Sequence, residues 1–404
     1  MDTLETASCW LAGLVVIYWV VSLVLVWDAK RNRILLQPEE TADLDRACSG
    51  PKISVIVAAK DEEQNIELCV QSMLDQDYPN FELIVVDDRS TDGTLKILQR
   101  LESTANGRLK VLHVQRLEKG WFGKNNAMRE GVQASSGDWF CFIDADCWQT
   151  SRQTLSVAMK DAFDSATDFL TITPVLTMTN TWEKVVQPPC ALTLMSWFHP
   201  QLVNDANQQT AYANGHFMLM SKACYETIGG HERVKNEMNE DILLARNTKR
   251  AGLKLRMADN FGLFRSRMYP GITSAWSGWS RIFCGCIRSV AGLLLTQAIV
   301  FTFAVLPWLC LAVTLIERLV TDSPVPWNSH IILWGGACLS QLLFSLYYFT
   351  IFELKKIWAV TFPLAGIFIL TTLVHATLKR LRLVNTTWRG TTYRMNKRVE
   401  APQE

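Results

Sequence analysis

The sequence predicts an α/β protein with a doubly wound, mainly parallel sheet, accompanied by one N-terminal and about three C-terminal membrane helices. Two observations lead to this fold class. Four stretches of 21 to 28 residues carry no charged side chain, and a long segment of ordinary soluble composition lies between the first and the second. Within that segment short β-branched runs alternate with amphipathic stretches, an order typical of a parallel sheet covered by helices.

The first charge-free stretch, Ala7–Trp27, has 21 residues, which as a helix is about one hydrocarbon thickness. Asp2 and Glu5 precede it without any Lys or Arg, so the basic start of a signal peptide is missing. We therefore expect a retained anchor in residues 1–29. The basic run Lys30–Arg33 then places the following segment in the cytoplasm by the positive-inside rule.

After a polar linker, residues 30–50, the segment 51–271 is expected to form the sheet domain. Its β-branched runs read as strands buried on both faces, and the stretches between them have a helical apolar period. The expected strands are Ile53–Ala59, Phe81–Val86, Leu109–Val114 and Trp139–Ile143, and the expected helices are Glu62–Asp75, Thr91–Leu101 and Gly123–Ala134. In such sheets the ligand binds beyond the carboxyl ends of the strands.

Acidic residues fall at those ends. Asp87 and Asp88 end the second strand, and Asp144 and Asp146 follow the fourth. Carboxylates that converge on one edge repel one another unless a cation or hydrogen-bond donors neutralise them. Mg²⁺ takes one or two protein carboxylates and completes its shell with water and substrate phosphates, which favours a nucleotide diphosphate as ligand. The alternative is that the last two residues only cap a helix near Thr150.

Composition excludes several other classes. The 40 Lys and Arg against 39 Asp and Glu leave no basic excess, so nucleic acid is not expected as a partner. The 49% hydrophobic content argues against disorder. The 11 cysteines include no pair with zinc-type spacing, so we expect reduced thiols and no thiolate metal site.

Three motifs resemble family 2 glycosyltransferases of the GT-A fold: Pro51–Glu63, Val85–Thr94 and Gly137–Asp146, with Gly120–Ala127 between them. The resemblance continues through Asn214–Met220, Gly229–His231, Asn239–Ala245, Arg267–Gly271 and the tail Asn385–Gly390. The chain is most similar to membrane-bound members that act on lipids. These include ceramide glucosyltransferases, hopanoid-associated enzymes and glycosyltransferases of carotenoid acids such as diaponeurosporenoate.

The resemblance implies a role for each matching residue in the nucleotide pocket. Ala59, Asp61 and Glu62 are expected to line it. Asp88 is expected to accept a hydrogen bond from the base, and Lys124 to lie near the diphosphate or the base. The implied donor is a nucleotide-diphosphate sugar, with a UDP-sugar favoured.

The resemblance also implies the catalytic groups. Asp144 would face the ribose and the sugar, and Asp144 and Asp146 would hold a divalent metal, Mg²⁺ or Mn²⁺. Asp241 would be the general base, with Glu240 as its rival. Inverting transfer needs only one base and a cation that stabilises the departing diphosphate.

The expected reaction is therefore the inverting transfer of a sugar to the hydroxyl or carboxyl group of a membrane lipid. One alternative is a processive polysaccharide synthase, although the Gln-x-x-Arg-Trp string that such members carry does not occur in this chain. The other is a non-catalytic membrane protein that binds sugar nucleotides, which predicts loss of the acidic residues named above.

Several residues keep two interpretations. His231 and His216 are either structural or contacts of metal and phosphate. Trp276, Trp279 and Arg281 are either an interfacial belt or acceptor contacts. The charge-free run Cys190–Phe198 is too short to span a bilayer and is either core or a helix half-sunk in the membrane surface.

The remaining segments complete the expected organisation of an integral protein of a bacterial-type inner or plasma membrane. They are an interfacial segment 272–288, membrane helices 289–380 and a basic cytoplasmic tail 381–404. Three plain crossings after the anchor would leave that tail outside, against the positive-inside rule. We therefore expect Ser289–Ile316 to enter and return as a helix broken at Pro307, with Trp388–Gly390 near the catalytic domain.

Overall fold

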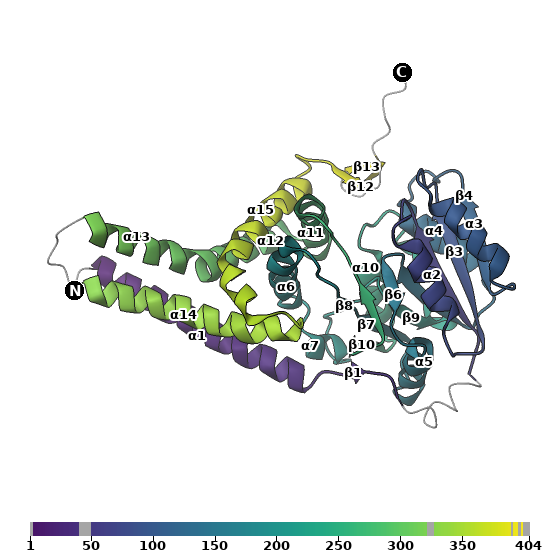
Figure 1. Ribbon diagram of the computed structural model, residues 1–404, viewed down its shortest axis with the longest axis horizontal. Coiled ribbons are helices and arrows are strands. Elements are labelled where there is room, and N and C mark those ends of the chain that lie inside the picture. The colour runs from purple at the N-terminus through teal and green to yellow at the C-terminus, as the bar shows by residue number, and fades with distance from the viewer. Residues whose placement is uncertain (1–2, 40–49, 321–326, 389–390, 395–396, 399–404) are drawn as a thin grey trace, which may run out of the picture. The chain divides into compact units, whose positions relative to one another are not determined.

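The computed structural model describes residues 3–39, 50–320, 327–388, 391–394 and 397–398. The chain divides into two compact units. One contains the sheets and spans 33–177, 198–268 and 385–404. The other contains the long apolar helices and spans 1–32, 178–197 and 269–384. Figure 1 labels many of the elements of both units.

The sheet unit is built on an eight-stranded sheet in the order β1-β10-β7-β9-β5-β2-β3-β4. All neighbouring pairs are parallel except those of β9, which runs antiparallel to β5 and β7. Its strands are β1 (Leu35–Leu36), β2 (Ile53–Ala59), β3 (Phe81–Asp88), β4 (Leu109–Val114), β5 (Trp139–Asp144), β7 (Phe169–Thr173), β9 (Met218–Ser221) and β10 (Leu255–Asn260). The predicted α/β class with a mainly parallel sheet is confirmed.

Helices follow the strands as the apolar period predicts. The helices of this unit are α2 (Ile66–Leu74), α3 (Thr94–Thr104), α4 (Gly123–Gln133), α5 (Thr154–Asp164), α7 (Pro200–Asn204), α8 (Lys222–Thr227), α9 (Gly230–Arg233) and α10 (Glu240–Arg250). Side chains such as Val55 and Val57 of β2 pack with Ile66 and Met73 of α2 in a fully buried core. This burial on both faces explains the uninterrupted apolar strands.

Two smaller sheets complete the unit. One joins β6 (Cys147–Gln149), β11 (Phe264–Ser266) and β8 (Val175–Leu176). The other joins β12 (Thr386–Trp388), β13 (Thr391–Arg394) and β14 (Lys397–Arg398). Two residues of the predicted tail contact, Arg389 and Gly390, lie outside the described residues.

Among the described residues, the helical unit holds four helices that are long and apolar enough to cross a membrane. They are α1 (Thr3–Arg31), a run formed by α12 (Val290–Val300), η2 (Phe301–Val305) and α13 (Leu306–Val320), then α14 (Trp327–Ile351), and finally η3 (Lys356–Thr361) with α15 (Phe362–Arg380). The unit also contains α6 (Thr181–Met195) and α11 (Ile272–Cys286). The helices agree with the predicted anchor and C-terminal block, and they indicate membrane association.

The predicted break within 289–316 is absent, because Val290–Val320 is one helical run. Phe301–Val305 forms a π-helical turn directly before Pro307. Proline removes one backbone donor, and such a widened turn is a place where a helix accommodates the ring without reversing. The expectation of a returning helix was therefore wrong.

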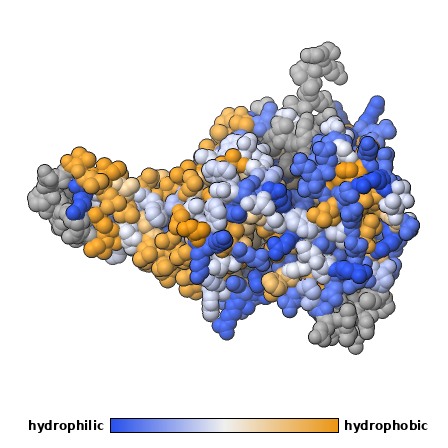
Figure 2. All heavy atoms as spheres, viewed as in Figure 1, coloured by the Kyte–Doolittle hydropathy of each residue, from blue (hydrophilic) through white to orange (hydrophobic). Residues whose placement is uncertain are grey.

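Within the helical unit α15 has a different set of neighbours from α14. α14 packs along both α1 and α13, whereas α15 packs on α6, α11 and α12. Figure 1 shows α15 running across the direction of α14. In Figure 2 apolar residues gather over α1, α13 and α14. Their exposed apolar side chains include Trp10, Ile17, Val24, Val313, Ile316, Ile332 and Leu343.

Candidate active site

The carboxyl ends of β2, β3 and β5 bring the predicted acidic residues to one edge of the sheet. The register pairs Ala59 of β2 with Asp87 of β3, and Ala58 with Asp144 of β5. Asp87 and Asp88 are the last residues of their strand rather than its successors, so β3 is two residues longer than predicted. Asp88 and Asp144 therefore lie on strands that flank β2 at its carboxyl end.

Lys124 bridges acidic groups of two elements, β5 and α10. It stands in the first turn of α4, and its Nζ lies 2.6 Å from Asp144 Oδ1 and 2.7 Å from Glu240 Oε1 in the first turn of α10. Burial opposes the charged form of Lys124, but the negative charges of Asp144, Glu240 and Asp241 outweigh it and raise the pKa of its ammonium. The cation therefore offsets part of the repulsion between the neighbouring carboxylates.

Glu240 and Asp241 occupy different environments although they are adjacent. Glu240 is only 2% exposed and is held by Lys124. Asp241 is half-buried, and its carboxylate accepts hydrogen bonds from the backbone N–H groups of Gly215, at 3.2 Å, and Ile242, at 2.8 Å. Burial and the charge of Glu240 raise the pKa of Asp241 to about 7, against the lowering effect of Lys124. A carboxylate with that pKa is suited to take a proton near neutral pH.

Gly215 brings a backbone segment unusually close to this group. A Cβ at that position would lie 2.8 Å from Lys124 Nζ and 3.1 Å from Asp144 Oδ2. Only glycine therefore allows the chain to approach the bridged carboxylates and donate to Asp241.

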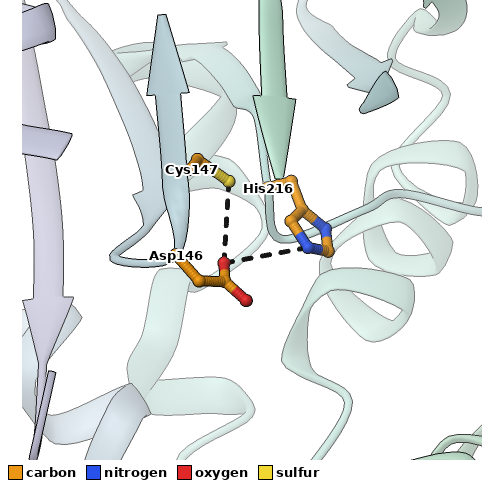
Figure 3. A group of neighbouring side chains, drawn as sticks. All are labelled: Asp146, Cys147 and His216. Atoms are coloured by element: carbon orange, nitrogen blue, oxygen red, sulfur yellow. Dashed lines mark hydrogen bonds and ion pairs between the residues drawn. The ribbon is translucent and has the colours of Figure 1, made fainter. Parts of the chain in front are cut away.

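Asp146, Cys147 and His216 form the group of ligand atoms that fits a metal ion among the described residues. Figure 3 shows that the three side chains converge. In the chain Asp146 follows β5, Cys147 begins β6, and His216 precedes β9. Asp146 Oδ1 lies 3.9 Å from His216 Nε2 and 3.7 Å from Cys147 Sγ. Asp144, the other predicted ligand, is paired with Lys124 and is not in this group.

His216 has the protonation state that a metal ligand needs. Its Nδ1 makes a short hydrogen bond with Asn214 Oδ1, which also accepts the backbone N–H of His216. This places the ring proton on Nδ1 and leaves the Nε2 lone pair toward Asp146, the arrangement that usually orients a ligating histidine. Burial lowers the pKa of His216, which favours the neutral ring.

Cys147 is a less suitable donor. Burial and the charges of Asp146 and Asp144 raise the pKa of its thiol well above the usual range, so it stays protonated. Hard divalent cations prefer oxygen ligands, which Asp146 supplies. The residues present thus fit a divalent ion bound through Asp146 and His216, with room for water or phosphate oxygens because Asp146 is partly exposed.

Two loops at the predicted nucleotide pocket have unusual backbone geometry. Asp61, after β2, has φ 53°, and Arg89, after β3, has φ 59°, both in the left-handed region. Asp61 Oδ1 accepts from the backbone N–H of Thr91 at 2.7 Å, and its own N–H donates to Ser90 Oγ at 3.0 Å. Such strained residues persist where the surroundings hold them, commonly at ligand sites.

Asp88 and Glu62 are already hydrogen-bonded within the chain. Both oxygens of Asp88 accept from Arg89, each at 2.8 Å, and Asp88 is buried. Glu62 accepts from Asn65 at 2.9 Å, and its backbone N–H donates to Thr94 Oγ1. A base that binds Asp88 would therefore have to share it with Arg89.

His231 lies apart from the metal-fitting group. It is fully buried, its Nδ1 lies 2.9 Å from the Tyr225 hydroxyl, and its ring packs on Phe142. Burial, with the positive charge of Lys124, lowers the pKa of His231 to about 3. The structure favours the structural interpretation of this histidine.

Comparison with known proteins identifies the sheet domain. Residues 54–229 match the family described as Glycosyl transferase family 2. This segment is a family 2 glycosyltransferase domain. The fold agrees: the mannosyltransferase PcManGT of Pyrobaculum calidifontis, solved with GDP-Man and Mn2+, superposes with a TM-score of 0.52 at 18% identity over 93% of this chain and 99% of that one. The GT-A fold expected from the motifs is therefore confirmed.

Curated relatives of the domain have diverse products. Poly-beta-1,6-N-acetyl-D-glucosamine synthase of Staphylococcus epidermidis is 29% identical over 133 residues, which are 32% of this chain and 29% of that protein. GalNAc(5)-diNAcBac-PP-undecaprenol beta-1,3-glucosyltransferase of Campylobacter jejuni is 33% identical over 96 residues, 24% of this chain and 30% of that protein. The chain thus spans about three tenths of the length of these relatives.

Two features of the site escaped the sequence interpretation. For His216 the sequence leaves both interpretations open, because a single histidine without a spaced partner is usually structural. The Asn-Gly-His order at 214–216 was the available signal, since an amide two residues before a histidine is placed to orient its ring. The ion pair between Lys124 and Glu240 joins residues 116 positions apart, and no local sequence pattern predicts it.

Proposed function

We propose that this chain is an inverting glycosyltransferase that moves a sugar from a nucleotide-diphosphate sugar to a membrane lipid. The observation that carries the proposal is the placement of Asp241, with its pKa raised to about 7, on the same edge of the sheet as the metal-fitting pair Asp146 and His216. Lys124 lies between the base and the metal-fitting pair, because it contacts Glu240, next to Asp241, and Asp144, two residues before Asp146. A base and a diphosphate-binding cation are the two groups that inverting transfer requires.

In the proposed reaction Asp241 takes the proton of the acceptor hydroxyl. The acceptor oxygen forms a bond to the anomeric carbon, while the bond from that carbon to the diphosphate breaks with its electron pair. The nucleotide diphosphate leaves, and the configuration at carbon inverts because attack and departure occur on opposite faces. No covalent intermediate with the protein forms, so no nucleophilic Ser, Cys or Lys is needed.

Asp146 and His216, with Asp144 if it exchanges Lys124 for the ion, would hold Mg²⁺ or Mn²⁺. The ion would neutralise charge on the diphosphate. The relative from Pyrobaculum calidifontis was solved with Mn2+ and GDP-Man, which supports a divalent ion and a nucleotide sugar for this fold. We favour a UDP-sugar as donor, with Asp61, Glu62 and Asp88 beside the nucleotide.

Membrane helices in the same chain support a lipid acceptor. The name of the relative from Campylobacter jejuni includes a lipid-linked acceptor. The basic residues Lys30 and Arg31 at the end of α1 favour a cytoplasmic sheet domain, where nucleotide sugars are made.

A processive polysaccharide synthase is the second candidate, because the relative from Staphylococcus epidermidis is named as one. The two differ in their product. Membranes containing the chain, or its Asp241→Asn variant, would be incubated with labelled UDP- and GDP-sugars. Label that enters the lipid extract with the wild type only supports the proposal. Label in a polymer that organic solvent does not extract would support the synthase, and no transfer from any donor would contradict both.

A further inference from the structure

A ladder of polar contacts joins α11 to α15 within the helical unit. On α11 every fourth residue contributes, and on α15 the same spacing recurs, so each set shares one helix face. The members are Trp276, Ser280 and Cys284 on α11, and Thr371, His375 and Lys379 on α15. Trp276 Nε1 donates to Thr371 Oγ1 at 3.1 Å, and the Trp276 ring stacks on His375 with centroids 4.2 Å apart.

Lys379 ends this ladder as a buried cation. Its residue is 4% exposed, and its Nζ donates to Ser280 Oγ at 2.8 Å. The Ser280 hydroxyl in turn donates to the carbonyl of Ser277 at 2.9 Å. An ammonium has three donors, and this neutral hydroxyl accepts one of them. Within the described ranges, no carboxylate lies at ion-pair distance from Lys379.

The groups around Lys379 add positive charge. Arg380 donates from Nη2 to the carbonyl of Cys284, and its Nε is buried without a hydrogen-bond partner among the described residues. Arg281 follows Ser280 on α11, and its Nη2 lies 3.5 Å from the Tyr269 hydroxyl. The Arg380 contact satisfies a carbonyl in the last turn of α11, which gives that arginine a structural role. Among the described residues, the Lys379 ammonium contacts α11 through the Ser280 hydroxyl alone.

A cation that is buried without a counter-charge is costly, and an anion that fills its remaining donor positions removes that cost. We propose that Lys379, with Ser280 and Arg380, binds the phosphate or carboxylate headgroup of a membrane lipid. The site lies at the end of the apolar α15, one helical turn from the partly exposed Trp276, and indole rings favour the membrane–water interface. Basic pockets between membrane helices are suited to anionic headgroups.

Two sources can supply this headgroup. One is a bulk anionic phospholipid, and the other is an acceptor lipid with an acidic headgroup, in which case the assignment rests on the proposed function. None of the residues at the sheet edge takes part in the site. The lipid-binding test below measures no sugar transfer, so its failure would leave the proposed function untouched.

The test uses the full chain in nanodiscs of phosphatidylcholine with increasing fractions of phosphatidylglycerol. We expect the Tm of the wild type to rise with the anionic lipid. Lys379→Met should show a higher Tm than the wild type in pure phosphatidylcholine, because the buried charge is gone, and no rise with phosphatidylglycerol. Lys379→Arg should retain the rise. Arg288→Gln removes an exposed charge just after α11 and should behave as the wild type.

If the Tm of the wild type does not rise with the fraction of phosphatidylglycerol, the proposal is overturned, whether or not Lys379→Met folds. A Lys379→Met variant whose Tm rises with phosphatidylglycerol as much as that of the wild type would also overturn it. Inorganic phosphate added to phosphatidylcholine discs should not reproduce the rise; if it does, the site binds free phosphate and not a lipid. Mass spectrometry of lipids retained by the wild type and lost from Lys379→Met then separates a phospholipid from the lipid that becomes glycosylated.

Discussion

Lys124 Nζ lies 2.7 Å from Glu240 Oε1, and this ion pair separates the roles of two adjacent carboxylates. Successive residues on a helix point about 100° apart, so Asp241 faces elsewhere when Glu240 is held by Lys124. The contact of Asp241 with the backbone of Gly215 shows where it faces. The geometry therefore supports Asp241 rather than Glu240 as the base. From the sequence alone, this assignment rested on the resemblance of a motif.

Asp241→Asn should lower the transfer rate by about 10²–10⁴-fold, the usual range for loss of general acid–base catalysis, while nucleotide binding persists. The amide keeps the shape of the side chain but cannot take a proton. Single-turnover transfer and nucleotide titration measure the two effects separately. Glu240→Gln is the matched variant and should lose less, since it only loosens Lys124. If Glu240→Gln is the more damaging change, the roles are reversed.

The pH dependence of kcat/KM should follow Asp241. Its pKa is raised to about 7, and the base acts when deprotonated, so kcat/KM should fall as the pH drops through about 7. Glu240, Lys124 and Asp144 are the charged groups that act on it. Glu240→Gln removes the negative charge that raises this pKa, so the acid limb should move to lower pH. A profile measured with saturating metal checks both statements, and an unchanged limb in that variant would contradict the assignment.

Two strands have the predicted bounds. Ile53–Ala59 is an apolar run that is buried along nearly its whole length, as expected for a strand inside a parallel sheet. Leu109–Val114 lies at the edge of the sheet, where Lys110 and His113 are exposed, and its β-branched residues together with its short length indicated a strand. The acidic residues at the sheet edge followed from the same reasoning. What the sequence could not show are contacts between distant segments, such as His216 beside Asp146 or Lys124 beside Glu240. These contacts depend on tertiary packing, which produces no periodic pattern in the sequence.

Metal affinity should depend on His216. His216→Gln removes the Nε2 ligand, so we expect the Mn²⁺ concentration for half-maximal activity to rise at least tenfold. Asp146→Asn should abolish transfer, because it removes the ligand charge. Direct Mn²⁺ binding, measured by paramagnetic resonance without substrate, provides a readout independent of activity. His199→Gln, at the start of α7, is the control histidine. Wild-type Mn²⁺ binding in both site variants would place the metal elsewhere.

The chain should cross the membrane three times, with α15 at the surface. α14 packs along α1 and α13, whereas α15 packs on the shorter helices α6 and α11 and on the α12–η2 part of the second run. Three crossings leave the end of α15 on the side where α1 ends. The flanking cations of that side are Lys30, Arg31, Arg288, Lys355, Lys356, Lys379 and Arg380.

The opposite side then receives the start of α1 and residues 317–328, which hold one arginine, Arg318, against the acidic Asp2, Glu5, Glu317 and Asp322. This distribution obeys the positive-inside rule at every helix end. It keeps the predicted cytoplasmic C-terminus but reaches it through α15 and not through a returning α12–α13. The side of the membrane on which Lys355 and Lys356 lie distinguishes the two topologies, because a returning α12–α13 would place both lysines outside.

An epitope inserted after Lys356 should therefore be detected only in permeabilised cells. The same epitope inserted after Ser323 should be detected in intact cells, since it follows the outward crossing of α13. Transfer activity of each insertion protein in membranes controls for misfolding. If the epitope after Lys356 is detected in intact cells while the one after Ser323 is not, α12–α13 does not cross and α15 does.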